Sequence, residues 1–149
     1  MSGDIKEILV PVDFTPTSDH ALEYAVDFAK KVGARITLVH SYEIPVYGFP
    51  DGALVATAEI ASRILEGAQA GLQATIEKYK DSGVEMRSVL RDGPPPDEIA
   101  TVAKEFEADL VILGTHGRTG LRRAIMGSVA EEVIRACECP VLAIHHQKS

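Results

Sequence analysis

Residues 108–134 read ADLVILGTHGRTGLRRAIMGSVAEEVI, which is an apolar run, a glycine-rich loop and a helical pattern in direct succession. The run at 108–114 has the length and the branched side chains of a buried strand. Glycines follow at 114, 117, 120 and 127, and the helical pattern starts near Ser128. Because glycines let a backbone approach a ligand closely and amides at a helix start point at anions, this stretch predicts phosphate-binding architecture.

The rest of the chain alternates strand and helix patterns around this stretch. Residues 5–12, 34–40 and 139–144 are further buried-strand candidates, and the more polar 84–90 is expected at an edge. Apolar residues spaced three and four apart predict four helices: after Thr15, over about 53–82, after the turn at 93–96, and from Ser128. In the second of these, Leu54 is expected to be the first residue of the apolar stripe. This α/β alternation predicts a doubly wound, open five-stranded parallel sheet with helices on both faces.

Local signals mark the ends of the helices. Thr15 is expected to cap the first helix, Pro16 to occupy its first turn and Gly33 to end it. Ser128 and Glu131 match the S-x-x-E capping box, which stabilises a helix start without a ligand. The last helix is expected to bury three apolar side chains, Val129, Val133 and Ile134. Residues 41–52 look too irregular for an element and are expected to form a surface loop near the site.

Size and charge restrict the class of protein. The 149 residues, 46% of them hydrophobic, suit one domain spanning 1–149. With 15 Lys and Arg against 22 Asp and Glu, the net charge of −7 disfavours nucleic acid and anionic membranes as partners. No leader or membrane-spanning run is apparent, so a cytoplasmic location is expected. Cys137 and Cys139 are most simply small buried residues, and together with His145 and His146 they lack the spacing of zinc modules.

The glycine-rich loop differs from the common nucleotide motifs. The sequence has no G-x-x-x-x-G-K-[ST], and no G-x-G-x-x-G follows the first strand, which disfavours a Walker loop and a dinucleotide fold. The loop does carry Arg118, Arg122 and Arg123. Arginine is well shaped to hold phosphate oxygens, yet a solvated surface face explains these three equally well.

The spacing Gly114-x2-Gly117-x9-Gly127-Ser128 resembles the G-x2-G-x9-G-[ST] signature of the ATP-binding branch of the universal stress protein family. The resemblance extends over ILVPVDFT, LVH, RDGPPPDEI, ADLVILGTHGRTG, MGSVAEEVI and CPVLAI, which is nearly the whole chain. It implies strand order 3-2-1-4-5, with Asp13 and Gly114 on adjacent strands where the order reverses.

The resemblance also implies a role in binding ATP or another adenine nucleotide, with Mg²⁺ beside the phosphates. Asp13 would lie near adenine or ribose, or would contact the Mg²⁺. Its alternative role is helix entry near Thr15. The implied nucleotide-binding residues are Pro11, Val12, Asp13, Val39, Leu113, Gly114, His116, Gly117, Gly127, Ser128 and Val129. Ala130 stands where some family members carry another hydroxyl, which leaves one phosphate contact in doubt.

The last predicted strand is expected to pair with a strand of another protein chain. The apolar run from Cys139 to Ile144 would be an edge strand, which is an aggregation hazard unless something pairs with it. The resemblance implies a homodimer through this strand. The function expected is a nucleotide-dependent regulatory or stress-protective protein that acts on an unknown client. Two alternatives stay open: a slow ATPase or nucleotidyl or phosphoryl transferase, with Asp13 or His116 as the base, and a dimeric interaction module without nucleotide.

Overall fold

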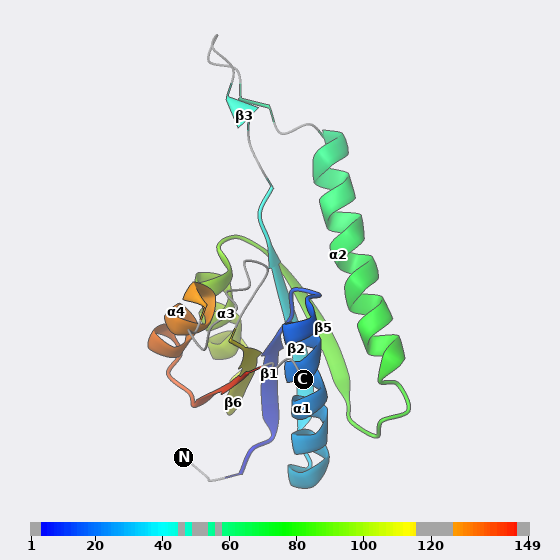
Figure 1. The fold of residues 1–149 in the computed structure, drawn as a ribbon, viewed down its shortest axis with the longest axis vertical. Helices are drawn as coiled ribbons and strands as arrows, with labels where there is room; N and C mark the ends of the chain where they lie inside the picture. The colour runs from blue at the N-terminus through cyan, green and yellow to red at the C-terminus, as the bar shows by residue number, and fades with distance from the viewer. Residues whose placement is uncertain (1–3, 45–46, 49–53, 56–57, 116–126, 146–149) are drawn as a thin grey trace.

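The computed structural model describes residues 4–44, 47–48, 54–55, 58–115 and 127–145. A five-stranded parallel sheet runs through its centre (Figure 1). The order of the strands across the sheet is β5-β2-β1-β6-β7. When these five strands are numbered in chain order, this is 3-2-1-4-5, which confirms the expected topology. The strands are β1 (Glu7–Pro11), β2 (Arg35–Tyr42), β5 (Met86–Asp92), β6 (Leu110–Gly114) and β7 (Val141–Ile144). A separate antiparallel pair joins β3 (Tyr47–Gly48) to β4 (Leu54–Val55).

Within the part of the chain that the structure describes, four helices cover the two faces of the sheet, as the alternation predicted. They are α1 (Pro16–Val32), α2 (Ala58–Lys78), α3 (Pro95–Glu105) and α4 (Ser128–Ala136). Figure 1 shows α1 and α2 on one side of the sheet and α3 and α4 on the other. Within the described ranges, no helix is both long and apolar enough to cross a membrane.

The central strand explains why apolar runs rather than alternating patterns encode this sheet. In β1, Ile8 and Val10 pack with α1 and α2, whereas Leu9 packs with α3 and α4. All three side chains are fully buried. Because both faces of this central parallel strand lie against helices, its three middle positions are all apolar.

Several predicted element boundaries hold, and two need correction. The Thr15 side chain caps α1 by accepting the Ser18 amide, Pro16 starts the helix, and Gly33 ends it in the left-handed conformation. By contrast, α2 is shorter than expected, and Leu54 belongs to β4 rather than to the helical stripe. The expected loop at 41–52 gives its first two residues to β2, because β5 extends far enough to pair with them. It also contains the two residues of β3, which pair with β4.

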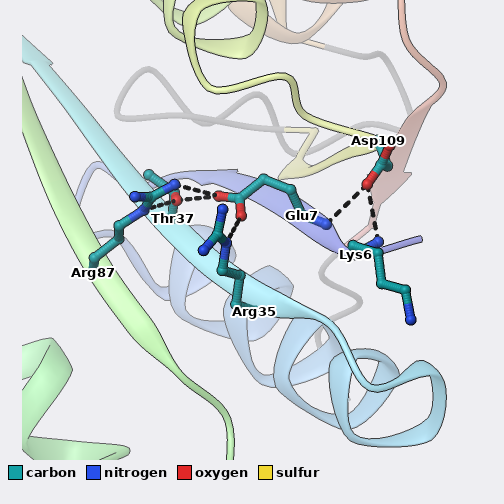
Figure 2. A network of polar contacts seen from close by, with 6 residues as sticks. All are labelled: Lys6, Glu7, Arg35, Thr37, Arg87 and Asp109. Atoms are coloured by element: carbon teal, nitrogen blue, oxygen red, sulfur yellow. Dashed lines mark hydrogen bonds and ion pairs between the residues drawn. The ribbon is translucent and has the colours of Figure 1, made fainter. Parts of the chain in front are cut away.

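The amino ends of the strands are tied together by a polar network that the sequence analysis did not anticipate (Figure 2). The buried Glu7 carboxylate accepts hydrogen bonds from Thr37 Oγ1, Arg35 Nε and an Arg87 Nη, the last at 3.3 Å. The bond to Glu7 raises the pKa of Arg35. Asp109 Oδ2 accepts the Lys6 and Glu7 amides at 2.9 and 3.0 Å. This network joins β1, β2 and β5 at the end of the sheet opposite the candidate site.

Candidate functional site

A cavity of about 740 Å³ lies at the carboxyl end of the sheet, beyond β1, β2 and β6. This is where an open parallel sheet binds ligands, at the point where the strand order reverses. His116 and Gly117 lie outside the described residues. The structure brings the other nine predicted residues together around the cavity: Pro11, Val12, Asp13, Val39, Leu113, Gly114, Gly127, Ser128 and Val129.

Asp13 enters the cavity from the end of β1 and also organises the start of α1. Its Oδ1 accepts the Thr15 amide at 3.1 Å and Thr15 Oγ1 at 2.5 Å. Its own amide donates to Ser18 Oγ at 3.1 Å. Among the described residues, no partner hydrogen-bonds to Oδ2. Asp13 therefore performs the helix-entry role through Oδ1 and also lines the cavity.

Among the features of the cavity, the start of α4 is the best suited to bind an anion. Gly127 is the N-cap residue, and no side chain caps the helix there. The expected capping box is therefore wrong: Ser128 is the first helical residue, one position too late for its hydroxyl to cap the helix. Within residues 127–145, no side-chain cap is recorded at the start of α4, and free amides at a helix start attract anions.

A single backbone contact places this helix start beside β6. The Gly127 amide donates to the Thr115 carbonyl at 2.5 Å. Thr115 is fully buried, and its amide donates to the Ile144 carbonyl of β7 at 3.1 Å. The residue that follows β6 thus holds the N-cap of α4 at the mouth of the cavity.

Gly114 has a packing reason to be glycine that is independent of any ligand. A Cβ at this position would lie 2.7 Å from Thr17 Cγ2 and 3.0 Å from the Thr17 carbonyl oxygen. Real Cβ atoms essentially never lie as close as 2.7 Å to another heavy atom, so a side chain at position 114 would force the Thr17 methyl to move. The first motif glycine therefore permits close contact between the end of β6 and the first turn of α1.

The backbone carbonyl of Val39 already accepts a hydrogen bond within the protein. Its carbonyl accepts the Val12 amide at 2.9 Å. Pairing between β1 and β2 ends at Pro11 with Val39, so Ser41, two residues further along the same edge of β2, extends past the paired part of β1. Ser41 also lines the cavity. The sequence analysis missed it because the length of β2 beyond its neighbour is set by pairing with β5.

The sequence analysis also did not identify the part of the cavity lining that comes from Phe14, His40 and α2. Phe14 and His40 lie against each other there, with ring centroids 4.7 Å apart. Four residues of α2, here called the α2 wall, form another part of the lining: Arg63, Ile64, Gly67 and Ala68. Nothing in the local pattern of α2 indicates a ligand, because its place over the cavity depends on packing across the sheet.

The prediction that α4 buries three apolar side chains is wrong for two of them. Val133 is fully buried, whereas Val129 and Ile134 are 37% and 41% exposed. Val129 lines the cavity. The helix turns its narrow Ala130 and Val133 face to the sheet because α3 packs beside it.

Both cysteines lie on the α3 and α4 side, away from the cavity. Burial, and to a smaller extent the neighbouring Cys139, raises the pKa of Cys137 to about 11. Burial also raises the pKa of Cys139. Across the described part of the chain, no three His, Cys, Asp or Glu side chains gather closely enough to hold a metal ion.

Comparison with known proteins gives a consistent result. The sequence model of the universal stress protein family matches residues 4–145. Universal stress protein MJ0531 of Methanocaldococcus jannaschii is 33% identical over 145 residues, covering 96% of this chain and 84% of that protein. The solved structure of MJ0577 from the same organism superposes with a TM-score of 0.80 at 25% identity, covering 97% and 99% of the two chains.

A further solved structure is informative about ligands. It is the universal stress protein from Archaeoglobus fulgidus in complex with dAMP, with a TM-score of 0.67 and 27% identity, covering 93% of this chain and 97% of that one.

Proposed function

The chain belongs to the universal stress protein family, and from this premise we propose that it binds an adenine nucleotide, foremost ATP, in the cavity at the carboxyl end of the sheet. One observation carries the proposal: the Gly127 amide bound to the Thr115 carbonyl sets an uncapped helix start at the mouth of the cavity. The dAMP complex of the Archaeoglobus fulgidus relative supports an adenine nucleotide as the ligand class.

The geometry of the cavity suggests how the nucleotide lies. The phosphates would face Gly127, Ser128 and Val129, where the amides of α4 point outward. Adenosine would then extend along Pro11, Val12 and Asp13 toward β2, with Leu113 and Gly114 below the ribose. His116 and Gly117 belong to the phosphate side of this proposal through the spacing of the motif. On the adenine side, the backbone of Ser41 complements that of Val39, whose carbonyl already accepts the Val12 amide.

Mg²⁺ belongs to the same proposal as a companion of the phosphates. A Mg²⁺ ion commonly combines one or two carboxylates with phosphate oxygens and water. The Asp13 carboxylate fits this donor set through Oδ2, because Oδ1 is engaged by Thr15. Bound Mg²⁺ would neutralise phosphate charge that otherwise repels Asp13.

We further propose that the protein acts as a nucleotide-dependent regulatory or stress-protective homodimer, in the cytoplasm where ATP is abundant, toward a client still to be identified. The dimer would form through β7, since the two edges of the sheet differ in character. The β5 edge carries the charged Arg87 and Arg91, whereas β7 consists of Val141, Leu142, Ala143 and Ile144, all partly exposed. Charged edges resist strand addition and apolar edges favour it.

The deciding experiment combines release of bound ligand with calorimetry. The protein is purified without added nucleotide, treated with acid, and the released molecule identified by mass spectrometry. ATP, ADP, AMP and cyclic AMP are then titrated with Mg²⁺ while phosphate release is assayed. We expect bound adenine nucleotide and slow or no turnover. Steady turnover would instead assign an ATPase or transferase, and absence of both ligand and heat would leave a dimeric interaction module.

A variant of Gly127 locates the phosphates. Gly127 has φ −64° and ψ 155°, which any residue adopts, so valine adds bulk there without backbone strain. We expect Gly127→Val to abolish nucleotide binding and to leave the far-ultraviolet circular dichroism spectrum unchanged. Ala136→Val places comparable bulk on the exposed last residue of α4 and serves as the matched control. Wild-type affinity in the Gly127→Val variant would mean that the phosphates lie elsewhere.

A further inference from the structure

Phe14 has a backbone conformation that its residue type does not favour. Its φ is 64°, in the left-handed region, which is uncommon for a bulky side chain. It sits within the turn in which Asp13 Oδ1 accepts the Thr15 amide, and it lines the cavity. Such strain persists only where surrounding contacts enforce it, and it concentrates at functional sites.

Contacts with β2 and with α2 hold the Phe14 ring. On one side is the His40 ring, 4.7 Å away between centroids. The imidazole is itself held, because its Nδ1 lies 2.8 Å from the Val12 carbonyl oxygen. The tip of the ring lies against Gly71 of α2, where an added Cβ would lie only 2.7 Å from Phe14 Cζ and 2.8 Å from Cε1. The ring is therefore clamped between β2 and the backbone of α2.

Besides the contact of Gly71 with Phe14, α2 packs on the sheet through Leu72 and Ile76, which lie at and beyond Gly71 along the chain. Only Ala68 and Leu72 of α2 are buried, and Figure 1 shows its amino-terminal half projecting past the end of the sheet. The α2 wall lies between that projecting end and Gly71. The distance between the wall and the sheet therefore depends on how closely α2 approaches the Phe14 ring.

We propose that Phe14 is a positioning residue: clamped between His40 and Gly71, it sets the distance of the α2 wall from the carboxyl end of the sheet. This inference rests on the proposed function for its effect on nucleotide affinity. The positioning itself concerns the protein without ligand and can be tested separately.

The test is a double-mutant cycle of Phe14→Leu and Gly71→Ala in the full chain, with Ala70→Ser on the exposed neighbouring position as control. Hydrogen exchange of peptides covering 58–72 is measured without ligand, and ATP affinity is measured by calorimetry. We expect Gly71→Ala to accelerate exchange in the α2 wall and to weaken ATP binding roughly tenfold. Alanine is the better helix former, so helix propensity alone would slow the exchange. Faster exchange in Gly71→Ala would therefore indicate displacement of α2 by the Phe14 ring, whereas slower exchange would indicate an effect of helix propensity alone.

The double variant supplies the second criterion. Leucine lacks the ring atoms that would meet the new Cβ, so we expect the double variant to recover the exchange and affinity that Gly71→Ala loses. Simple addition of the two single effects, or unchanged exchange in Gly71→Ala, would overturn the proposal. If wild-type protein binds no nucleotide, the proposed function fails and the exchange measurements still decide the positioning. If Gly71→Ala does not fold, Phe14→Leu alone must accelerate exchange in the α2 wall, because it loosens the same clamp.

Discussion

Individual residues of this chain often serve two roles, and the structure separates them. Asp13 uses one carboxylate oxygen to organise the start of α1 and also lines the cavity. Gly114 looks like a ligand-binding glycine in the sequence, yet its contact with Thr17 alone requires that no Cβ be present. Glu7 has no part in the cavity, and it is the buried acid that joins three strands (Figure 2).

Removing the charge of Glu7 is predicted to cost stability. In Glu7→Gln, Arg35 and Arg87 lose their counter-ion, although they are 46% and 44% exposed and regain water. We therefore expect about 1–2 kcal/mol less free energy of unfolding at pH 7, measured by urea denaturation. The control is Glu77→Gln, which breaks the exposed pair with Lys80 and should cost under about 0.5 kcal/mol. Equal losses in the two variants would show that the burial of Glu7 is unimportant.

The cysteines are predicted to be poor nucleophiles in the folded protein. A pKa of about 11 at Cys137, against an ordinary value of 9.0, leaves roughly 100-fold less thiolate at pH 8. We expect iodoacetamide to label Cys137 of a Cys139→Ser variant 10- to 100-fold more slowly in the folded than in the unfolded protein, by mass spectrometry. Equal rates would contradict this.

The same shift has a consequence for stability. Because the pKa is raised in the folded state, the contribution of Cys137 to stability is present below pH 9 and is lost as the pH rises through about 11.

At the scale of elements, the two edge strands differ in what they offer to another strand. The Val111 amide donates to the Pro140 carbonyl and the Thr115 amide to the Ile144 carbonyl. Alternation along a parallel strand therefore turns the amides of Val141 and Ala143 away from β6. On the other edge, the Ile36 amide donates to the Glu85 carbonyl, so Ser88 of β5 presents its amide outward in the same way.

This alternation yields a matched test of the proposed dimer. Proline at position 143 removes an outward amide while keeping the bonds to β6, and edge positions tolerate proline. We expect wild-type protein to sediment as twice the 16.0 kDa chain and Ala143→Pro as a monomer. Ser88→Pro makes the same change on β5 and should remain dimeric. A dimeric Ala143→Pro variant, or a monomeric wild type, would exclude association through β7.

At the scale of the whole molecule, the candidate site is a product of the topology. The strand order places the ends of β1 and β6 together, and residues far apart in the chain, such as Asp13 and Gly127, meet around one cavity. The Glu7 network binds the strands at the opposite end. The amino ends of the strands are thus joined by the hydrogen bonds and ion pairs of Glu7. The carboxyl ends border the cavity, which α2 lines on one side.

The sequence by itself determined the fold class, the strand order through the family resemblance, the caps of α1 and the set of motif residues. These depend on local periodicity and on short-range hydrogen bonds such as Thr15 to Ser18, which a few neighbouring residues specify. Only the tertiary structure decided that Gly127 rather than Ser128 occupies the N-cap position of α4, that Ile134 faces outward, and that Phe14, His40 and α2 line the cavity. Those outcomes depend on which elements pack against each other across the sheet, and no local pattern encodes such long-range contacts.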